Sequence, residues 1–166
     1  MLNYSTPEKL NDGRYFVKVL EPFVTTIKDV NISRSDEFFN IRLSDSSVIT
    51  DIESQIIDDS VANSVQWFSK EISKDVVSNY FQSAVDENVV QVEDNLNSRG
   101  KSQVVFFNPN KESTQLDESA TYLALVQLDG IWFLKKSFGP VWRLIQARVK
   151  KEVQPPSCLI KDEDSD

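Results

Sequence analysis

The 166-residue chain contains no histidine, one cysteine and only four glycines. Without histidine, neither a Ser-His-Asp nor a Cys-His catalytic set can form, and the usual zinc sites lack their ligands. The glycines form neither a P-loop nor a dinucleotide-binding motif. These absences favour a binding or structural protein over an enzyme, and we expect no catalytic residue, no cofactor and no metal.

A single cysteine, Cys158, excludes a disulfide framework within the chain and fits a reducing compartment. No apolar run approaches the ~20 residues that span a bilayer, and the polar first ten residues carry no secretory signal. We therefore expect an intracellular protein without membrane attachment. Its length suits one domain with appendages.

The apolar pattern predicts strands toward both ends of the chain and helices between them. Aromatic and β-branched residues predict strands at 14–21 and 23–30, separated by Pro22. Residues 37–43 alternate between apolar and polar positions, which is typical of a strand. Further strands are predicted at 89–92, 103–107, 121–128, 131–134 and 141–153, with a hairpin turn at Asp129-Gly130.

Two helices are predicted in the middle of the chain. Thr50 and Glu53 match a capping box, and helical spacing of apolar residues continues to Phe68. A second helix is predicted at 74–86. Together, the predicted strands and helices indicate a mainly β protein with inserted helices (α+β), either a barrel or a sandwich. Residues 1–13 are polar and are predicted to form a loose N-terminal arm.

Basic and aromatic residues gather near the carboxyl end, although the net charge is −8. Residues 130–151 contain six basic residues, no acid and four large aromatics. Cations beside aromatic rings on strands suit single-stranded nucleic acid, because phosphates meet the charges and bases stack on the rings. The alternative is that the rings are core and the charges solvated. Since Arg143 shares a face with Val141 and Ile145, we expect it to be partly buried or at an edge.

A second group, Arg99, Lys101 and Lys111 beside Phe106 and Phe107, could extend this groove or consist of ordinary loop charges. The negative net charge repels DNA and RNA at long range, so any binding site must be local and duplex DNA is a poor ligand.

The last residues form an acidic tail after Pro155-Pro156. This tail, at 155–166, is predicted to be disordered. It either keeps the chain soluble or acts as a polyanion mimic that occupies the basic groove or binds partner proteins. Its carboxylates are Asp162, Glu163, Asp164 and Asp166.

The acid pairs Asp58-Asp59 and Glu93-Asp94 leave a carboxylate-metal nuclease as a third hypothesis. Such a site requires acids that converge in a pocket.

Three motifs near the carboxyl end stand out: Leu128-Asp129-Gly130-Ile131-Trp132-Phe133, Phe138-Gly139-Pro140-Val141-Trp142 and Gln146-Ala147-Arg148-Val149. A middle segment contains Trp67-Phe68 and Tyr80-Phe81, and the chain closes with the acidic tail. In these features the sequence resembles the single-stranded-DNA-binding proteins of large eukaryotic DNA viruses, which are related to the replicative single-strand binder of short-tailed bacteriophages.

The resemblance implies an OB-like β-barrel domain at 14–154 with a helical insertion at about 50–86. It implies sequence-tolerant coating of single-stranded DNA during viral replication and recombination in an infected cell, at a site in the cytoplasm or nucleus. The tail would regulate DNA access or recruit viral DNA polymerase, helicase or primase, and a homodimer is allowed. The alternative is a virion or replication-complex interaction protein without nucleic-acid affinity.

The predicted DNA site combines stacking and phosphate contacts. Trp132, Phe133 and Trp142 would stack on bases or shape the groove. The predicted cationic contacts are Arg99, Lys101, Lys135, Lys136, Arg143, Arg148 and Lys150.

Overall fold

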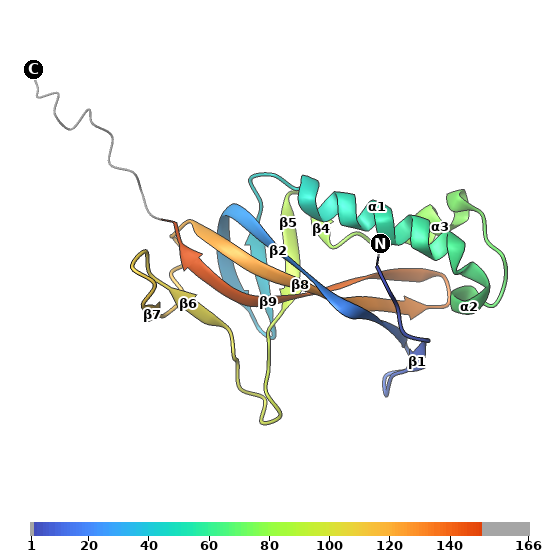
Figure 1. Ribbon diagram of the computed structural model, residues 1–166, viewed down its shortest axis with the longest axis horizontal. Helices are drawn as coiled ribbons and strands as arrows, with labels where there is room; N and C mark the ends of the chain where they lie inside the picture. Colours follow the sequence, from blue (N-terminus) through green and yellow to red (C-terminus); the bar gives the residue numbers. More distant parts are fainter. Residues whose placement is uncertain (1, 151–166) are drawn as a thin grey trace, which may run out of the picture.

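The computed structural model describes residues 2–150, which form a mainly β fold with three helices (Figure 1). The predicted tail, with Asp162, Glu163, Asp164 and Asp166, lies outside this range. The helices are α1 (Ser47–Ala62), α2 (Ser64–Phe68) and α3 (Lys74–Tyr80). The strands are β1 (Glu8–Lys9), β2 (Tyr15–Ser35), β3 (Phe38–Arg42), β4 (Val85–Asp86), β5 (Val89–Glu93), β6 (Val105–Phe107), β7 (Ser113–Thr114), β8 (Tyr122–Leu134) and β9 (Ser137–Val149).

Five of these strands close into a ring. The long strand β2 pairs with β3 through its last residues, Asn31 to Ser35, and with β8 along most of its length. β3 continues to β5, and β8 pairs with β9. A parallel contact between Glu93 of β5 and Arg143 of β9 closes the ring. The predicted mainly β class with inserted helices is therefore confirmed.

Alternating side chains of the ring strands fill its interior. Phe39, Ile41 and Leu43 are buried as their period-2 pattern predicted, and Val17, Leu128 and Leu144 lie fully inside. The helices lie together along one side of the sheet (Figure 1). They pack against the end of the β8–β9 hairpin through Trp67 and Phe68, whose rings contact Phe133 at centroid distances of 5.5 Å.

β2 runs through Pro22 rather than ending there. The pairing with β8 is interrupted between Lys18 and Phe23, where the register shifts. Proline has no N–H to donate to a neighbouring strand. Because β2 and β8 are not paired at this interruption, no hydrogen bond is lost there. The two strands predicted on either side of Pro22 are therefore one strand.

The predicted hairpin turn at Asp129-Gly130 is wrong. β8 continues through both residues, and the register against β9 shifts between Leu128 and Gly130. Such a bulge uses the same residue types as a turn. The chain instead reverses at Lys135-Lys136, between the paired residues Leu134 and Ser137.

The helical boundaries also differ from the prediction. α1 begins at Ser47, so Thr50 and Glu53 lie inside the helix and do not form a capping box. The predicted helix 51–68 is divided at Asn63, and the helix predicted at 74–86 ends at Tyr80.

The N-terminal arm is attached to β2 rather than loose. Glu8 and Lys9 form β1, which pairs with β2, and the amide of Leu20 donates to the carbonyl of Asn3 at 2.8 Å. The hydroxyl of Tyr4 donates to Asp59 of α1. The arm thus connects the edge of β2 to the helical layer.

Candidate nucleic-acid interface

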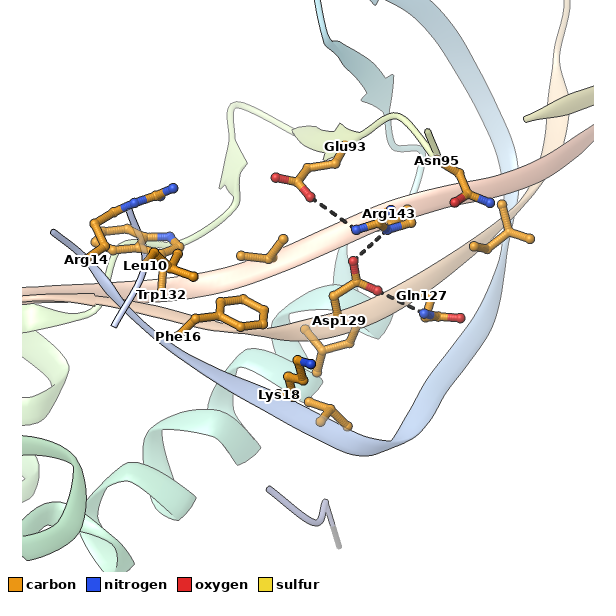
Figure 2. A pocket seen from close by; sticks show the side chains of 14 residues that line it. Leu10, Arg14, Phe16, Lys18, Glu93, Asn95, Gln127, Asp129, Trp132 and Arg143 are labelled. Atoms are coloured by element: carbon orange, nitrogen blue, oxygen red, sulfur yellow. Dashed lines mark hydrogen bonds and ion pairs between the residues drawn. The ribbon is translucent and has the colours of Figure 1, made fainter. Parts of the chain in front are cut away.

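A groove of about 680 Å³ opens on the outer face of the ring, where β2, β8 and β9 lie side by side. Figure 2 shows side chains from all three strands around it. We call it the aromatic groove. Its walls include Leu10, Arg14, Phe16, Lys18, Glu93, Asn95, Gln127, Asp129, Trp132, Val141, Arg143 and Ile145.

The alternation of β2 brings Phe16 and Lys18 to the groove. Val17 and Val19 are buried in the ring, so the side chains between and before them take the opposite face. Arg14 follows the same alternation just before the strand begins.

Two glycines provide the surface on which the aromatic rings of the groove lie. A Cβ at Gly130 would lie 2.5 Å from Cζ of Phe16, and a Cβ at Gly139 would lie 2.9 Å from Nε1 of Trp132. Each ring therefore packs directly against the backbone of a neighbouring strand. Both side chains remain partly exposed on the outer face.

Arg143 lies between two carboxylates. Its Nε is 2.6 Å from Oδ2 of Asp129, and its Nη2 is 3.6 Å from Oε1 of Glu93 (Figure 2). Asp129 also accepts a hydrogen bond from Nε2 of Gln127 at 2.9 Å. These contacts fix the guanidinium and neutralise part of its charge.

Glu93 has a raised pKa. Burial is the main cause, Arg143 acts in the opposite direction, and the charge of Asp129 adds to the rise. The carboxylate of Glu93 is therefore protonated at a higher pH than an ordinary glutamate.

Lys18 contributes a cation to the groove that is not neutralised by a near acid. Among residues 2–150, no carboxylate lies within ion-pair distance of its ammonium group. Arg14 pairs with the exposed Asp12 at 2.8 Å. The groove thus combines two partly exposed rings with three cations and two carboxylates.

The structure separates the predicted stacking residues. Trp132 lines the groove, whereas Phe133 and Trp142 are only 4% and 1% exposed. Phe133 stacks on Phe138 at 5.6 Å inside the fold, and Trp142 packs edge-on against Phe23. Direct stacking of a base on Phe133 or Trp142 is therefore excluded, which leaves the predicted role of shaping the groove from beneath.

The predicted cations lie in several places. Arg143 lines the groove beside Val141 and Ile145, partly buried as predicted. Lys135 and Lys136 are exposed at the turn of the β8–β9 hairpin, which follows Trp132 closely in the chain.

The remaining predicted cations lie away from the groove. Arg148 lines a second pocket toward the other end of β9. Lys150 pairs with Asp29 at 2.5 Å. Arg99 and Lys101 occupy a turn in which both backbone amides donate to Oδ1 of Asn97, and neither lines the aromatic groove.

Sequence reasoning missed Arg14, Phe16 and Lys18. The signal was present in residues 14–19, where basic and aromatic side chains alternate with tyrosine and valine. Recognising it requires knowing which face of the strand is inside.

The acid pairs are engaged in other contacts. Asp58 pairs with Lys74 at 3.2 Å, and Asp94 pairs with Arg34 at 2.6 Å. Within the described range 2–150, no three potential metal ligands converge. The helices in that range are also too short or too polar to cross a bilayer.

The chain belongs to DUF5871, a family of unknown function whose model matches residues 25–158. No curated protein matches it. Among solved structures, it is similar to the single-stranded DNA-binding protein from bacteriophage Enc34, with a TM-score of 0.47 and 10% identity over 98% of this chain and 97% of that chain. The same phage protein in complex with ssDNA gives a TM-score of 0.46 and 10% identity, over 93% of this chain and 98% of that one.

At TM-scores below 0.5, these likenesses assign no function to this chain. The resemblance to the single-strand binders of large eukaryotic DNA viruses stays a prediction, since the matching family model has no assigned function.

Proposed function

We propose that the protein binds single-stranded DNA, without sequence preference, through the aromatic groove. The observation that carries this proposal is the pair of rings, Phe16 and Trp132, that lie on glycines of adjacent strands beside Lys18 and Arg143. Stacking on such rings tolerates any sequence because every base has a π-face, and the cations meet the phosphates. The chain acts as a binder, not as an enzyme.

The arrangement of the ring supports a finer proposal, that the fold is of the OB type. An OB fold is a partly open barrel of five strands, and its loop between the fourth and fifth strands contacts oligonucleotides. In order along the chain, the five ring strands are β2, β3, β5, β8 and β9. The turn between the last two contains Lys135 and Lys136, and we infer that these exposed cations contact the DNA beyond Trp132.

The biological setting is proposed from the sequence resemblance alone. It consists of coating single strands during viral replication and recombination inside an infected cell. The acidic tail would regulate DNA access or recruit replication proteins.

Tryptophan fluorescence tests DNA binding directly. Trp67 and Trp142 are buried, whereas Trp132 lies in the groove, so quenching by a ligand reports on the proposed site. We expect oligo-dT to quench the emission, a matched duplex not to, and salt to weaken the effect. No response to either ligand would favour an interaction protein without nucleic-acid affinity.

A substitution at Phe16 tests the stacking itself. Phe16→Leu keeps an apolar side chain over Gly130 but removes the π-face, so we expect a loss of about 1–3 kcal/mol, or ~5- to 150-fold in Kd. Tyr15→Leu is the matched control, because Tyr15 is the preceding residue on the opposite face and is 47% exposed. Equal affinity of Phe16→Leu and the control would contradict the stacking role.

A further inference from the structure

A second pocket, of about 320 Å³, opens on the outer face of the sheet at the end remote from Trp132. Four strands lie side by side there. Phe107 of β6 is opposite Arg148 of β9, which is opposite Leu123 of β8, and Leu125 is opposite Thr26 of β2. All five residues line the pocket.

This pocket repeats the chemistry of the aromatic groove. Phe106 is buried, so Phe107 turns its ring to the outer face, where it stays partly exposed. Arg148 lies beside it on the next strand, and Lys111 adds a second cation. In the part of the chain that the structure describes, no carboxylate is within ion-pair distance of either cation.

The turn that carries Lys111 is held by hydrogen bonds. Lys111 has a left-handed backbone with φ of 66°, and its amide donates to the carbonyl of Asn108 at 2.9 Å. The side-chain oxygen of Asn108 accepts from the amides of Asn110 and Glu112. Asparagine stabilises turns in this way, so the backbone at Lys111 is fixed beside the pocket.

The outer face connects this pocket to the aromatic groove. Leu125 lines the second pocket and Gln127 lines the groove, two residues apart on the same face of β8. On β9, Ile145 lines the aromatic groove and the next residue, Gln146, lines the second pocket. The stretch of β8 from Leu123 to Trp132 covers at most ~30 Å at ~3.3 Å per residue.

We propose that the second pocket is a further subsite for the same single strand of DNA. The strand would run along the outer face of β8 and β9 from Trp132 to Phe107. There a base would stack on Phe107, and Lys111 and Arg148 would contact phosphates. This inference rests on the proposed function of the aromatic groove. At ~3.4 Å per stacked nucleotide, the path holds up to about nine nucleotides.

Oligo-dT length is the variable that tests this path, with Trp132 emission as the readout. Ligands of about 4 and about 12 nucleotides lie within the range of site sizes known for OB folds. In wild type, we expect the longer ligand to bind more tightly. In Lys111→Ala/Arg148→Ala, we expect the short ligand to bind as in wild type. The long ligand should lose at least about tenfold in affinity, and its salt slope should fall by about 1.4.

Two further variants complete the experiment. Phe107→Leu should also weaken only the long ligand, by ~5- to 150-fold. Lys70→Ala removes one exposed lysine from the loop after α2 and should change neither affinity. Melting temperatures identify any variant that fails to fold. If Phe107→Leu fails to fold, the double variant Lys111→Ala/Arg148→Ala, which changes only surface cations, still provides the test.

The outcomes separate the two proposals. If the double variant and Phe107→Leu bind both ligands as wild type does, the second subsite is wrong and the aromatic groove stands. The pocket is then open to another ligand, such as an acidic peptide. If neither ligand quenches the wild-type protein, the proposed function fails and the subsite fails with it.

Discussion

At Gly130 and Gly139 the outer face of the sheet consists of backbone alone, and the rings of Phe16 and Trp132 lie against it, the latter together with the carbonyl of Gln82. A ring held against backbone loses little freedom when a base stacks on its other side. At the residue scale, the binding surface thus depends on two positions without side chains as much as on the aromatic residues.

Glu93 is the residue through which pH should act on this surface. Its raised pKa means that it becomes neutral at a higher pH than an ordinary glutamate. Arg143 then loses one of its two carboxylate partners and is more available to phosphate. We expect oligo-dT to bind about two- to fivefold more tightly at pH 5 than at pH 7, as for one exposed ion pair. Glu93→Gln should bind more tightly at pH 7 and lose most of the pH dependence.

Fluorescence titrations of both proteins from pH 7 to pH 5 measure this effect. Glu71→Gln, at an exposed acid outside the groove, serves as the control. The same pH dependence in wild type and Glu93→Gln would show that another group is responsible.

At the scale of elements, α1 is attached to the segment before β4 through a buried carboxylate. Glu53 is 5% exposed and accepts hydrogen bonds from the hydroxyl of Ser83 at 2.6 Å and the amide of Ala84 at 2.7 Å. These residues precede β4. The contact fixes the helix relative to the strand that follows the insertion.

Removing that carboxylate should destabilise the protein. Glu53→Ala leaves two donors without their partner, which costs about 1–3 kcal/mol. Asp58→Ala on the same helix removes only an exposed ion pair with Lys74 and should cost about 1 kcal/mol or less. Denaturant unfolding at pH 7 compares the two, and equal losses would mean that the Glu53 contacts add nothing.

The stability of wild type relative to Glu53→Gln should also depend on pH. Burial raises the pKa of Glu53 above its usual value of 4.5, so the folded state holds the proton more tightly than the unfolded chain does. This contribution is complete below pH 4.5 and is lost as the pH rises through the raised pKa. Thermal unfolding of both proteins across this range measures it, and a constant difference would contradict the assigned cause.

Elements could be predicted from the sequence where one face of a strand or helix is buried. The alternation through Phe39 and Ile41 gave β3 correctly, because burial follows the same period. Turn signals failed at Asp129-Gly130, since a bulge within a long strand uses the same residues as a hairpin. Glu53 was misassigned because its partners, Ser83 and Ala84, are some 30 positions away in the chain.

The sequence predicted the part of the candidate site that lies in one segment and missed the part that strand pairing brings to it. Trp132 and Arg143 stood out because basic and aromatic residues are concentrated in their segment. Phe16 and Lys18 come from a strand more than 100 residues earlier and join them only through the pairing of β2 with β8. That pairing is a tertiary contact that local patterns do not encode.

At the scale of the whole molecule, a net charge of −8 opposes the approach of DNA. Removing residues 155–166 takes away four acids and one lysine and changes the net charge to −5. We expect about two- to tenfold tighter binding of oligo-dT at low salt, and no difference at 1 M salt, where the Debye length is ~3 Å.

Titrations at both salt concentrations measure this difference. A full-length variant with the four tail carboxylates replaced by amides keeps the chain length and should behave like the truncated protein. If only the truncated protein binds more tightly, the length of the tail matters rather than its charge.

The closure of the ring also sets an order of events during synthesis. Among the strands of residues 2–150, β9 is synthesised last, and it pairs with β8, β5 and β6. Until it emerges, β8 has an open edge along its whole length, a template on which other chains can add strands. Nascent chains that stall after Leu134 should therefore present that edge to other chains, and the thirteen residues of β9 are what cover it.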